Sequence, residues 1–556
     1  MIRNVKSCIL ITILLIVSSK PVIAGHQFED PLFGNETIEN DLINNFLDST
    51  EFDITRDPTP QDTASLLVEL GAVAILQEDF FLHTNPLVTR PVTTLSPFYN
   101  ARIPAYCKTA NFNFFYNQTS RMNFTKESTA ISSYLAIQSQ SLLDKINSST
   151  ITDLIKKLKF DLFPVDLLAL FKNTAINERR AGCMFQYDRR WDRMRFRSMT
   201  PLYYLERNFF LTENERENIE RTLGKTSEED AFNFAKQHLI CDKVGIGDTR
   251  IMIDVDLYSC TVFDSKIGFC LTLPTAFSMG SGLIGSSFKK SQKRPVLNIT
   301  NLLALLEGTT AQQEQAKELA TAFGLGIIDS LSANLLNAEL GNNKHLGVGV
   351  YYESATALEN FIKMPWARHF SLKSYGMLEY QIPKTERRYF VAFDESQLYN
   401  NLRLNRSKED ISNDIDNDPI YAQQVLTFLE QQIVDKFYPF PFDVQVHPII
   451  MVHTVSKLQY DAPNWGFFLG FDFWLASKEQ LKNVGIVRTD NNRPPNIDIG
   501  KAIKPRAYES KIIAGASWSI KRDNLDWLLS LNGDSSYWGS GIGNNFTLSF
   551  NVAVNF

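Results

Sequence analysis

Residues 545–556 read Asn545-Phe546-Thr547-Leu548-Ser549-Phe550-Asn551-Val552-Ala553-Val554-Asn555-Phe556, and apolar residues occupy every second position without exception. Side chains of a β-strand point to opposite faces in turn, so this stretch predicts a strand with one apolar face. In a soluble sheet, such a strand would invite pairing with other chains, whereas a strand that closes a membrane barrel has no free edge. The apolar face comprises Phe546, Leu548, Phe550, Val552, Val554 and Phe556.

The same alternation recurs along the chain in segments of about ten residues. Each segment is weak evidence by itself, but several together, separated by turn residues, are typical of a β-barrel. The clearest examples are residues 110–116, 370–382, 442–453, 465–475, 511–521 and 527–531.

The terminal Phe, with apolar residues at every second position before it, resembles the C-terminal strand signal of Gram-negative outer-membrane β-barrel proteins. The resemblance implies an all-β fold, a transmembrane antiparallel β-barrel of roughly 12 to 16 strands. It also implies that outer-membrane lipid surrounds the barrel, and that the apolar positions of residues 545–556 act as a membrane-insertion signal for the barrel-assembly machinery.

The first residues predict export. Arg3 and Lys6 precede an apolar core at residues 9–17, and Val22-Ile23-Ala24 offers a cleavage site, so residues 1–24 are interpreted as a cleaved signal peptide. The expected location is the cell outer membrane. We divide the rest into an acidic N-terminal extension or plug, residues 25–95, and a barrel with helical insertions, residues 96–556.

Composition excludes two other classes of protein. The mature chain has no run of 18 apolar residues, and mean hydropathy is only -0.16, which excludes a multi-helix membrane protein. A net charge of -6 provides no concentrated basic face, so no nucleic-acid partner is expected. An aromatic content of 12%, with 40 Phe and 19 Tyr, suits the interfacial girdles of a barrel.

Several stretches predict helices between the strands. The best start signal is Asp418-Pro419, a cap and a first-turn proline before residues 420–437. These helices are amphipathic, so in a barrel they can lie only in long loops or in the lumen. A mixed α+β secreted protein remains the alternative fold. The other helix-like stretches are residues 131–146, 152–171 and 312–340, with capping boxes at 212–215 and 227–230.

Charged residues at alternate positions suggest a pore lining. Arginines at positions 193, 195 and 197 would share one strand face, and aspartates at 254 and 256 would share another. A row of cations on a lumen wall would attract anions, and arginines opposite carboxylates resemble the constriction of general porins. An exposed strand or a solvated rim is the alternative for both groups. The candidate pore-lining residues are Arg193, Arg195, Arg197, Asp254 and Asp256.

A hairpin centred on Ser265 would place Cys260 directly opposite Cys270, close enough for a disulfide bond. Two reduced cysteines that act as small apolar fillers are the alternative.

No motif predicts catalysis. The chain has neither a Gly-x-Ser-x-Gly elbow nor a His-Glu-x-x-His helix, and no Cys-x-x-Cys pair. His447 and His453 would lie on one predicted strand, about 20 Å apart, too far to share a metal. We therefore expect no enzymatic activity, no cofactor and no metal site.

The sequence thus favours an outer-membrane, porin-like channel for passive diffusion of small solutes. One alternative is a plugged transporter for hydrophobic substrates, similar to the long-chain fatty-acid channels. A surface adhesin or structural barrel that uses the large loops is another.

Overall fold

The computed structural model describes residues 59–69, 86–95, 97–100, 108–120, 122, 175–210, 232–259, 263–286, 295–337, 339–390, 396–482, 497–522 and 525–555. The predicted signal peptide, the stretches 131–146 and 152–171, the capping boxes at 212–215 and 227–230, and Phe556 lie outside these residues.

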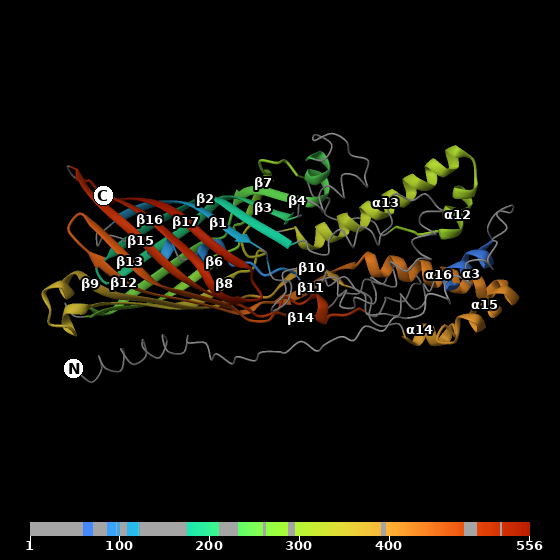
Figure 1. Cartoon of the computed structure of the whole chain (residues 1–556). Coiled ribbons are helices and arrows are strands. Elements are labelled where there is room, and N and C mark those ends of the chain that lie inside the picture. Colours follow the sequence, from blue (N-terminus) through green and yellow to red (C-terminus); the bar gives the residue numbers. More distant parts are fainter. Residues whose placement is uncertain are drawn as a thin grey trace, which may run out of the picture.

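Within the described residues, twelve antiparallel strands close into a barrel (Figure 1). Neighbours pair in the order β2-β1-β17-β16-β15-β13-β12-β9-β8-β6-β5-β3, and pairing of β3 with β2 closes the ring. Closure gives every strand two neighbours, as a membrane barrel requires. The strands are β1 (Lys108–Ser120), β2 (Ala175–Trp191), β3 (Met194–Phe210), β5 (Thr249–Ser259), β6 (Phe263–Leu273), β8 (Gly347–Ala357), β9 (Phe370–Gln381), β12 (Ile449–Asp461), β13 (Trp465–Ala476), β15 (Ala507–Arg522), β16 (Leu525–Ser540) and β17 (Asn544–Asn555).

Shorter strands extend the barrel wall at one end. β4 (Ile240–Ile246) and β7 (Phe277–Ser281) continue outward from β3, and β10 (Lys384–Phe390), β11 (Phe440–His447) and β14 (Gln480–Lys482) form a small separate sheet. The described helical elements are α3 (Pro60–Glu69), η1 (Val92–Thr94), α5 (Pro97–Asn100), η2 (Ala235–Leu239), α12 (Ile299–Glu307), α13 (Thr310–Leu335), η3 (Leu358–Asn360), η4 (Pro365–His369), α14 (Ser396–Asn401), α15 (Lys408–Asn417), α16 (Pro419–Phe437) and η5 (Gly500–Ala502).

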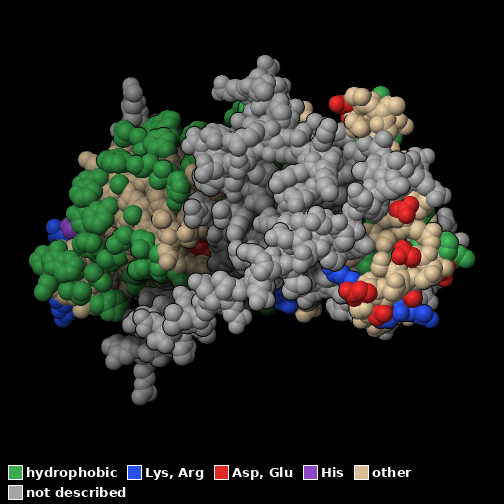
Figure 2. All heavy atoms as spheres, turned by 45° about the vertical axis from the view of Figure 1, so that its right-hand side comes forward, with side chains coloured by type: hydrophobic (Ala, Val, Ile, Leu, Met, Phe, Trp, Pro, Cys, Tyr) green, Lys and Arg blue, Asp and Glu red, His purple; other side chains and the backbone are tan. Residues whose placement is uncertain are grey.

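The predicted alternation of β17 is present in the structure. Leu548 and Phe550 are 54% and 43% exposed on the outside, while Thr547 and Asn551 are fully buried on the inside. The outer surface of the barrel is accordingly covered by apolar side chains, whereas charged side chains gather beyond it, over the helices (Figure 2). This distribution matches a barrel whose outer wall faces lipid.

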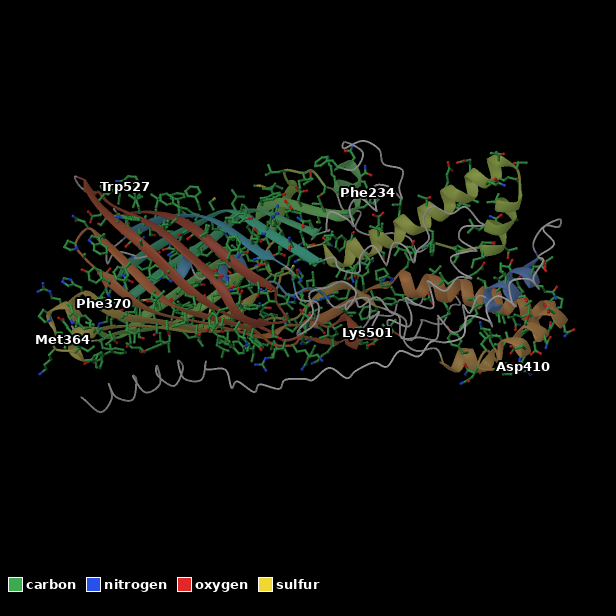
Figure 3. The ribbon with its side chains drawn as sticks, viewed as in Figure 1. Phe234, Met364, Phe370, Asp410, Lys501 and Trp527 are labelled. Atoms are coloured by element: carbon green, nitrogen blue, oxygen red, sulfur yellow. The ribbon has the colours of Figure 1, made fainter. Side chains whose placement is uncertain are left out.

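Aromatic side chains cluster where the barrel wall ends. Tyr460, Trp465 and Phe467 stack on one another at one end, with ring centroids 5.1 to 6.0 Å apart. Trp527 and Phe370 lie at the same end in Figure 3, while Lys501 lies near the opposite end. Aromatic rings concentrated at the edge of an apolar band are typical of the boundary between membrane and water.

The two ends of the barrel differ in their connections. At one end, which we call the turn end, β2, β5, β8, β12 and β15 finish, and at most twelve residues separate each from the next barrel strand in sequence. At the other end, the loop end, β1, β9 and β13 finish, and many more residues separate each from the next barrel strand, whereas β16 and β17 are separated only by the short turn 541–543. In outer-membrane barrels, short turns face the periplasm and long loops face outward.

The longer helices α12, α13, α15 and α16 lie at the loop end (Figure 1), as the sequence predicts for insertions that cannot face lipid. α16 begins as expected, with Pro419 in its first turn and the Asp418 side chain accepting a hydrogen bond from the amide of Ile420 at 2.9 Å. α3 packs against α15 and α16, and its Gln61 donates to the Ile415 carbonyl at 3.2 Å. No helix among the described residues is long and apolar enough to cross a membrane.

One predicted strand is wrong. The alternation from residue 442 to 453 is split between β11, in the small sheet, and β12, in the barrel. The break occurs because Pro448 has no amide hydrogen to donate and Ile449 adopts a positive φ of 67°. His447 and His453 therefore belong to two sheets.

The arrangement predicts on which side of the membrane each end lies. A cysteine at exposed Asp62, in α3, should react with a membrane-impermeant maleimide on intact cells, because α3 lies at the loop end. A cysteine at exposed Arg193, in a turn-end connection, should react only after the outer membrane is permeabilised. The unmodified protein measures the background from the native cysteines, and the reverse labelling pattern would contradict this orientation.

Candidate channel lumen and its plug

A segment of the chain outside the barrel strands fills the lumen. The side chains of Val88, Val92, Leu95 and Phe98 are at most 6% exposed, and they form one cluster with inward-facing residues of the barrel wall. We call residues 86–100 the plug. In Figure 1 the blue plug elements lie among the strands of the barrel. The wall residues around it include Met184, Met199, Met252, Tyr351, Tyr375, Met377, Met451 and Trp474.

The plug is held on one side by a buried cation. Arg90 is 1% exposed, and its Nη2 lies 2.8 Å from Oδ2 of Asp472 on β13. Its Nη1 lies 3.2 Å from Oε2 of Glu509 on β15, and Nη2 also lies 3.0 Å from Nε2 of His453 on β12. Three neighbouring strands thus contact one plug side chain, and Arg180 of β2 donates to the Arg90 carbonyl at 2.6 Å.

The charge of Arg90 is compensated inside the lumen. The carboxylates of Asp472 and Glu509 both lie within 3.2 Å of its guanidinium. The pair of carboxylates and the arginine therefore form a buried ionic cluster. Removing one member of such a cluster leaves an uncompensated buried charge.

A second arginine holds the plug from the opposite wall. Arg250 of β5 donates through Nη1 to the Thr93 carbonyl at 3.2 Å and to the Tyr99 hydroxyl at 2.8 Å. Its Nη2 lies 2.6 Å from Oε2 of Glu379 on β9, and Arg250 and Glu379 are both fully buried. The plug is thus bound to both sides of the barrel wall, by Arg90 and by Arg250.

The plug runs from one end of the barrel to the other. α3, which precedes it, packs on the loop-end helices, whereas β1, which follows it, begins at the turn end with Lys108 opposite Arg189. The described residues of the plug therefore lie, in sequence, between a helix at the loop end and a strand that begins at the turn end. Residues 86–95 belong to the region that the sequence assigns to an extension or plug.

The structure brings two of the predicted arginines together with carboxylates. Arg195 and Asp254 are direct cross-strand partners on β3 and β5, and their side chains lie 2.8 Å apart. Arg197 lies 2.9 Å from Asp188, and Asp256 lies 2.6 Å from Arg190. Arg195 and Arg197 both also contact Glu353. The inward arginines are thus paired with carboxylates.

Arg193 does not join this row. Arg193 lies in the two-residue connection between β2 and β3 and is exposed. The prediction that it lines the lumen wall is therefore wrong. A turn at Asp192 and Arg193 interrupts the stretch that the sequence pattern suggests as one strand, and Asp192 adopts a positive φ of 46° there. The exposed side chain of Arg193 therefore contributes to the turn-end rim.

The predicted disulfide bond between Cys260 and Cys270 is also wrong, because Cys270 is a free thiol. Ser265 pairs with Tyr258 and Asp264 pairs with Ser259, so Ser265 belongs to a paired strand and is not the centre of the hairpin loop. This register places Cys270 opposite Met252, inside the lumen, where it is a buried free thiol. Cys260 itself lies outside the described residues.

The insertion signal faces outward where it is described. Phe546, Leu548, Phe550, Val552 and Val554 occupy the outer face of β17, each next to a buried inward residue.

A cavity of about 290 Å³ lies near the turn end of the lumen. Phe98 and Tyr99 of the plug line it on one side, together with Tyr375 and Val455 of the wall, and charged side chains of the wall line it elsewhere. Arg189 also lines it, but its guanidinium lies over the Trp191 ring, 4.5 Å from the centroid. We call this space the turn-end cavity.

Sequence reasoning missed the ionic cluster around the plug. A signal was present, because Asp472 is the one charged residue on an inward face of β13 that otherwise carries Gly466, Phe468, Gly470 and Trp474. A lone aspartate on such a face indicates a buried cation partner, but nothing in the sequence pairs it with Arg90. Among the described residues, no group of metal-ligating side chains could hold an ion.

No family model matches the sequence, and no curated protein matches it. Among solved structures, an outer-membrane channel from Pseudomonas putida F1 matches with a TM-score of 0.37 and 8% identity, over 84% of this chain and 100% of that one. The Pseudomonas putida toluene transporter TodX matches with a TM-score of 0.27 and 9% identity, over 87% and 96%. The NanC porin matches with a TM-score of 0.22 and 6% identity, over 68% and 93%.

These similarities concern the fold alone. The closed ring of twelve strands, the apolar exterior and the aromatic cluster at the end of the wall are features of an outer-membrane β-barrel.

The ionic cluster predicts a large effect of one substitution. Arg90→Ala should destabilise the folded barrel by about 3–5 kcal/mol, because Asp472 and Glu509 remain buried without their cation. The temperature at which the heat-modifiable band unfolds on a gel measures the loss. Arg190→Ala is the matched control, since its side chain is 34% exposed beside Asp256 and its pair should contribute less than about 1 kcal/mol. Equal effects of the two substitutions would contradict the buried cluster.

The register predicts the redox state of Cys270. After unfolding without reductant, Cys270 should be alkylated as a free thiol, because the residue opposite it is Met252. Peptide mapping by mass spectrometry measures this. Recovery of a peptide that links Cys260 to Cys270 would show that the register is wrong.

Proposed function

We propose that this protein is a plugged outer-membrane channel, whose lumen is closed at rest by residues 86–100 and opens when the plug rearranges. The observation that supports it best is the position of Arg90, buried between Asp472 and Glu509 across the lumen. A porin with a permanently open pore has no need of a chain segment held in this way. The plugged alternative from the sequence therefore fits better than the passive pore.

The middle of the lumen favours solutes with an apolar surface. Five methionines face the plug there, at positions 184, 199, 252, 377 and 451, beside Tyr351, Tyr375 and Trp474. Methionine side chains are flexible and polarisable, so they can adapt to different apolar shapes. A small solute that displaced the apolar plug residues would meet the same lining.

The proposal is for transport and not for catalysis. The inward carboxylates Asp188, Asp254 and Glu353 each contact an arginine, an arrangement that suits structural counter-ions. We also propose that residues 1–24 direct export and that the outward face of β17 is recognised during barrel assembly.

The orientation of the barrel sets the position of the two openings. We propose that the loop end faces the outside and that the turn-end cavity opens toward the periplasm, since long connections are extracellular in this class. A solute that enters would pass the plug before it reaches the turn-end cavity.

The proposal predicts that weakening the ionic cluster opens the channel. In planar bilayers, the wild type should be mostly closed, whereas Arg90→Ala should show conductance at least several-fold higher, because two unpaired carboxylates would draw water into the lumen. Single-channel recording in potassium chloride measures the difference. Arg190→Ala should behave as the wild type, because it leaves the plug contacts intact.

A rescue variant tests the physical cause. Arg90→Met/Asp472→Asn/Glu509→Gln removes all three charges at nearly constant volume, so the plug should remain seated and the channel closed. Heat-modifiability gels establish that each variant is folded. A folded Arg90→Ala barrel that stays as closed as the wild type would contradict the proposal, as would a wild type that conducts freely.

A further inference from the structure

Three amide side chains gather on the inner face of β1 and β17. Among the described residues, Asn111, Asn113 and Asn551 are the buried side-chain amides in which neither the oxygen nor the nitrogen has a hydrogen-bond partner. All three are fully buried and alternate with residues on the outer face, so they point into the lumen. We call them the amide cluster. Burying an amide without hydrogen bonds costs free energy, so the closed protein carries this cost three times on one part of its wall.

The members of the amide cluster are close neighbours. Asn113 and Asn551 are direct cross-strand partners, and Asn111 precedes Asn113 by two residues on the same face of β1. Directly opposed side chains lie about 4.5–5.5 Å apart at Cβ, and side chains two residues apart on a strand lie about 7 Å apart. One small molecule can therefore reach all three amides.

Another asparagine on the same face of β1 is fully paired. Asn117 donates through Nδ2 to side-chain oxygens of Asn545 and Thr547, at 2.9 and 3.1 Å. The wall can thus satisfy an inward asparagine by itself. The amide cluster has no such partners among the described residues, so its donors and acceptors are available to a ligand.

The side chains beside the amide cluster are uncharged. They are the inward cross-strand neighbours on β2, β16 and β17, namely Met184, Gln186, Ser530 and Ala553. Asp188, the next inward residue of β2 toward the turn end, is already paired with Arg197 at 2.9 Å. A charged ligand would be buried here without an opposite charge beside it, which is costly. The cluster therefore favours an uncharged group that both donates and accepts hydrogen bonds, as an amide does.

The plug covers a ring next to the amide cluster. Phe98 lies edge to face on Phe115, with ring centroids 5.5 Å apart, and Phe115 follows Asn113 on the inner face of β1. The turn-end cavity lies beside this contact, because Phe98 and Thr109 both line it. A solute whose ring replaced Phe98 on Phe115 would hold a polar substituent within reach of Asn113.

We propose that the amide cluster binds the polar end of small uncharged aromatic amides, while the solute ring takes the place of Phe98 on Phe115. This inference rests on the proposed channel function, because the solute reaches the cluster only when the plug moves. The bound solute supplies the hydrogen bonds that the cluster lacks in the closed state. Binding therefore favours the open state of the channel.

The stability of two variants tests whether the cluster is unpaired. Asn113→Leu and Asn117→Leu make the same change on the same face of β1. Asn113→Leu should keep or raise the unfolding temperature on a heat-modifiability gel, because the amide that it removes has no hydrogen bond. Asn117→Leu should lower that temperature by at least about 2 °C, because it removes paired donors. Equal losses in the two variants would overturn the assignment.

Isothermal titration calorimetry with benzamide and the purified full-length protein in detergent tests the site itself. We expect benzamide to bind, and its affinity to fall more than about tenfold in Asn113→Leu/Asn551→Leu, because hydrogen bonds to its amide are lost. Asn401→Leu, at an exposed position of α14, is the matched control and should bind as the wild type does. A wild type that does not bind benzamide, or a folded double variant with unchanged affinity, overturns the assignment.

Two further probes separate hydrogen bonding from charge. Acetophenone has the shape of benzamide but carries a methyl group in place of the NH₂, so it should bind at least about tenfold more weakly. Benzoate keeps the ring but is charged, and it should also bind more weakly than benzamide. Equal affinity for acetophenone overturns the role of the amides as acceptors, and equal affinity for benzoate overturns the preference for uncharged solutes.

The position of the plug should change the affinity for benzamide. Arg90→Ala should bind benzamide more tightly than the wild type, because a larger fraction of the molecules is in the open state that exposes the cluster. An Arg90→Ala channel that conducts but binds benzamide with the affinity of the wild type would show that the solute does not replace Phe98.

The channel experiment fails independently of the binding experiment. If Arg90→Ala opens the channel but benzamide does not bind, the amide site is wrong and the plugged channel stands. If benzamide binds through Asn113 and Asn551 but Arg90→Ala stays closed, the binding site stands and the channel proposal is wrong.

Discussion

Closure of the twelve-stranded ring is the constraint on which the rest of the structure depends. In lipid, each backbone amide and carbonyl must be paired within the protein, so the pairing of β2 with β3 has to complete the ring. A ring of twelve strands encloses more space than its own side chains fill. The inward charges therefore need partners inside the lumen, and the plug supplies several of them. Arg90 neutralises Asp472 and Glu509 from within, while Arg250 reaches from the wall to Thr93 and Tyr99.

On the proposed function, the plug is held in one position and later released, and buried ion pairs suit such a segment. Burying a charge is costly, so such a pair adds little stability beyond what an apolar contact would give, yet it defines one position sharply. The plug combines both kinds of contact, because Val92, Leu95 and Phe98 pack against methionines and aromatic rings of the wall. Apolar packing stabilises the plug inside the barrel, and the arginine contacts fix its position along the lumen. A change that satisfies Asp472 and Glu509 by other means would leave the apolar packing and the hydrogen bonds that Arg180 and Arg250 donate to the plug.

The sequence predicts the wall better than the contents of the lumen. Alternation in β9, β13 and β17 identifies which residues face lipid, because period two is a local property of the strand. Which strands pair is not a local property. The sequence could therefore suggest, but not establish, that Arg195 lies opposite Asp254. For the same reason, the predicted hairpin register at Cys270 was wrong. Arg90 was missed since its partners lie 363 to 419 residues away in the chain. A continuous apolar alternation can also hide a strand boundary. At Pro448 and Ile449, one such alternation passes from the small sheet into the barrel.

The path of the chain limits how the plug can move. Before the plug, α3 is held at the loop end by the cluster that includes Val68, Ile415 and Val425; after it, β1 is part of the wall from Lys108 onward. Both ends of the segment are thus tied to the barrel, at opposite openings. On the proposed function, opening needs only a rearrangement within the lumen, in which residues 86–100 exchange their contacts with Asp472, Glu509 and Arg250 for contacts with water or solute.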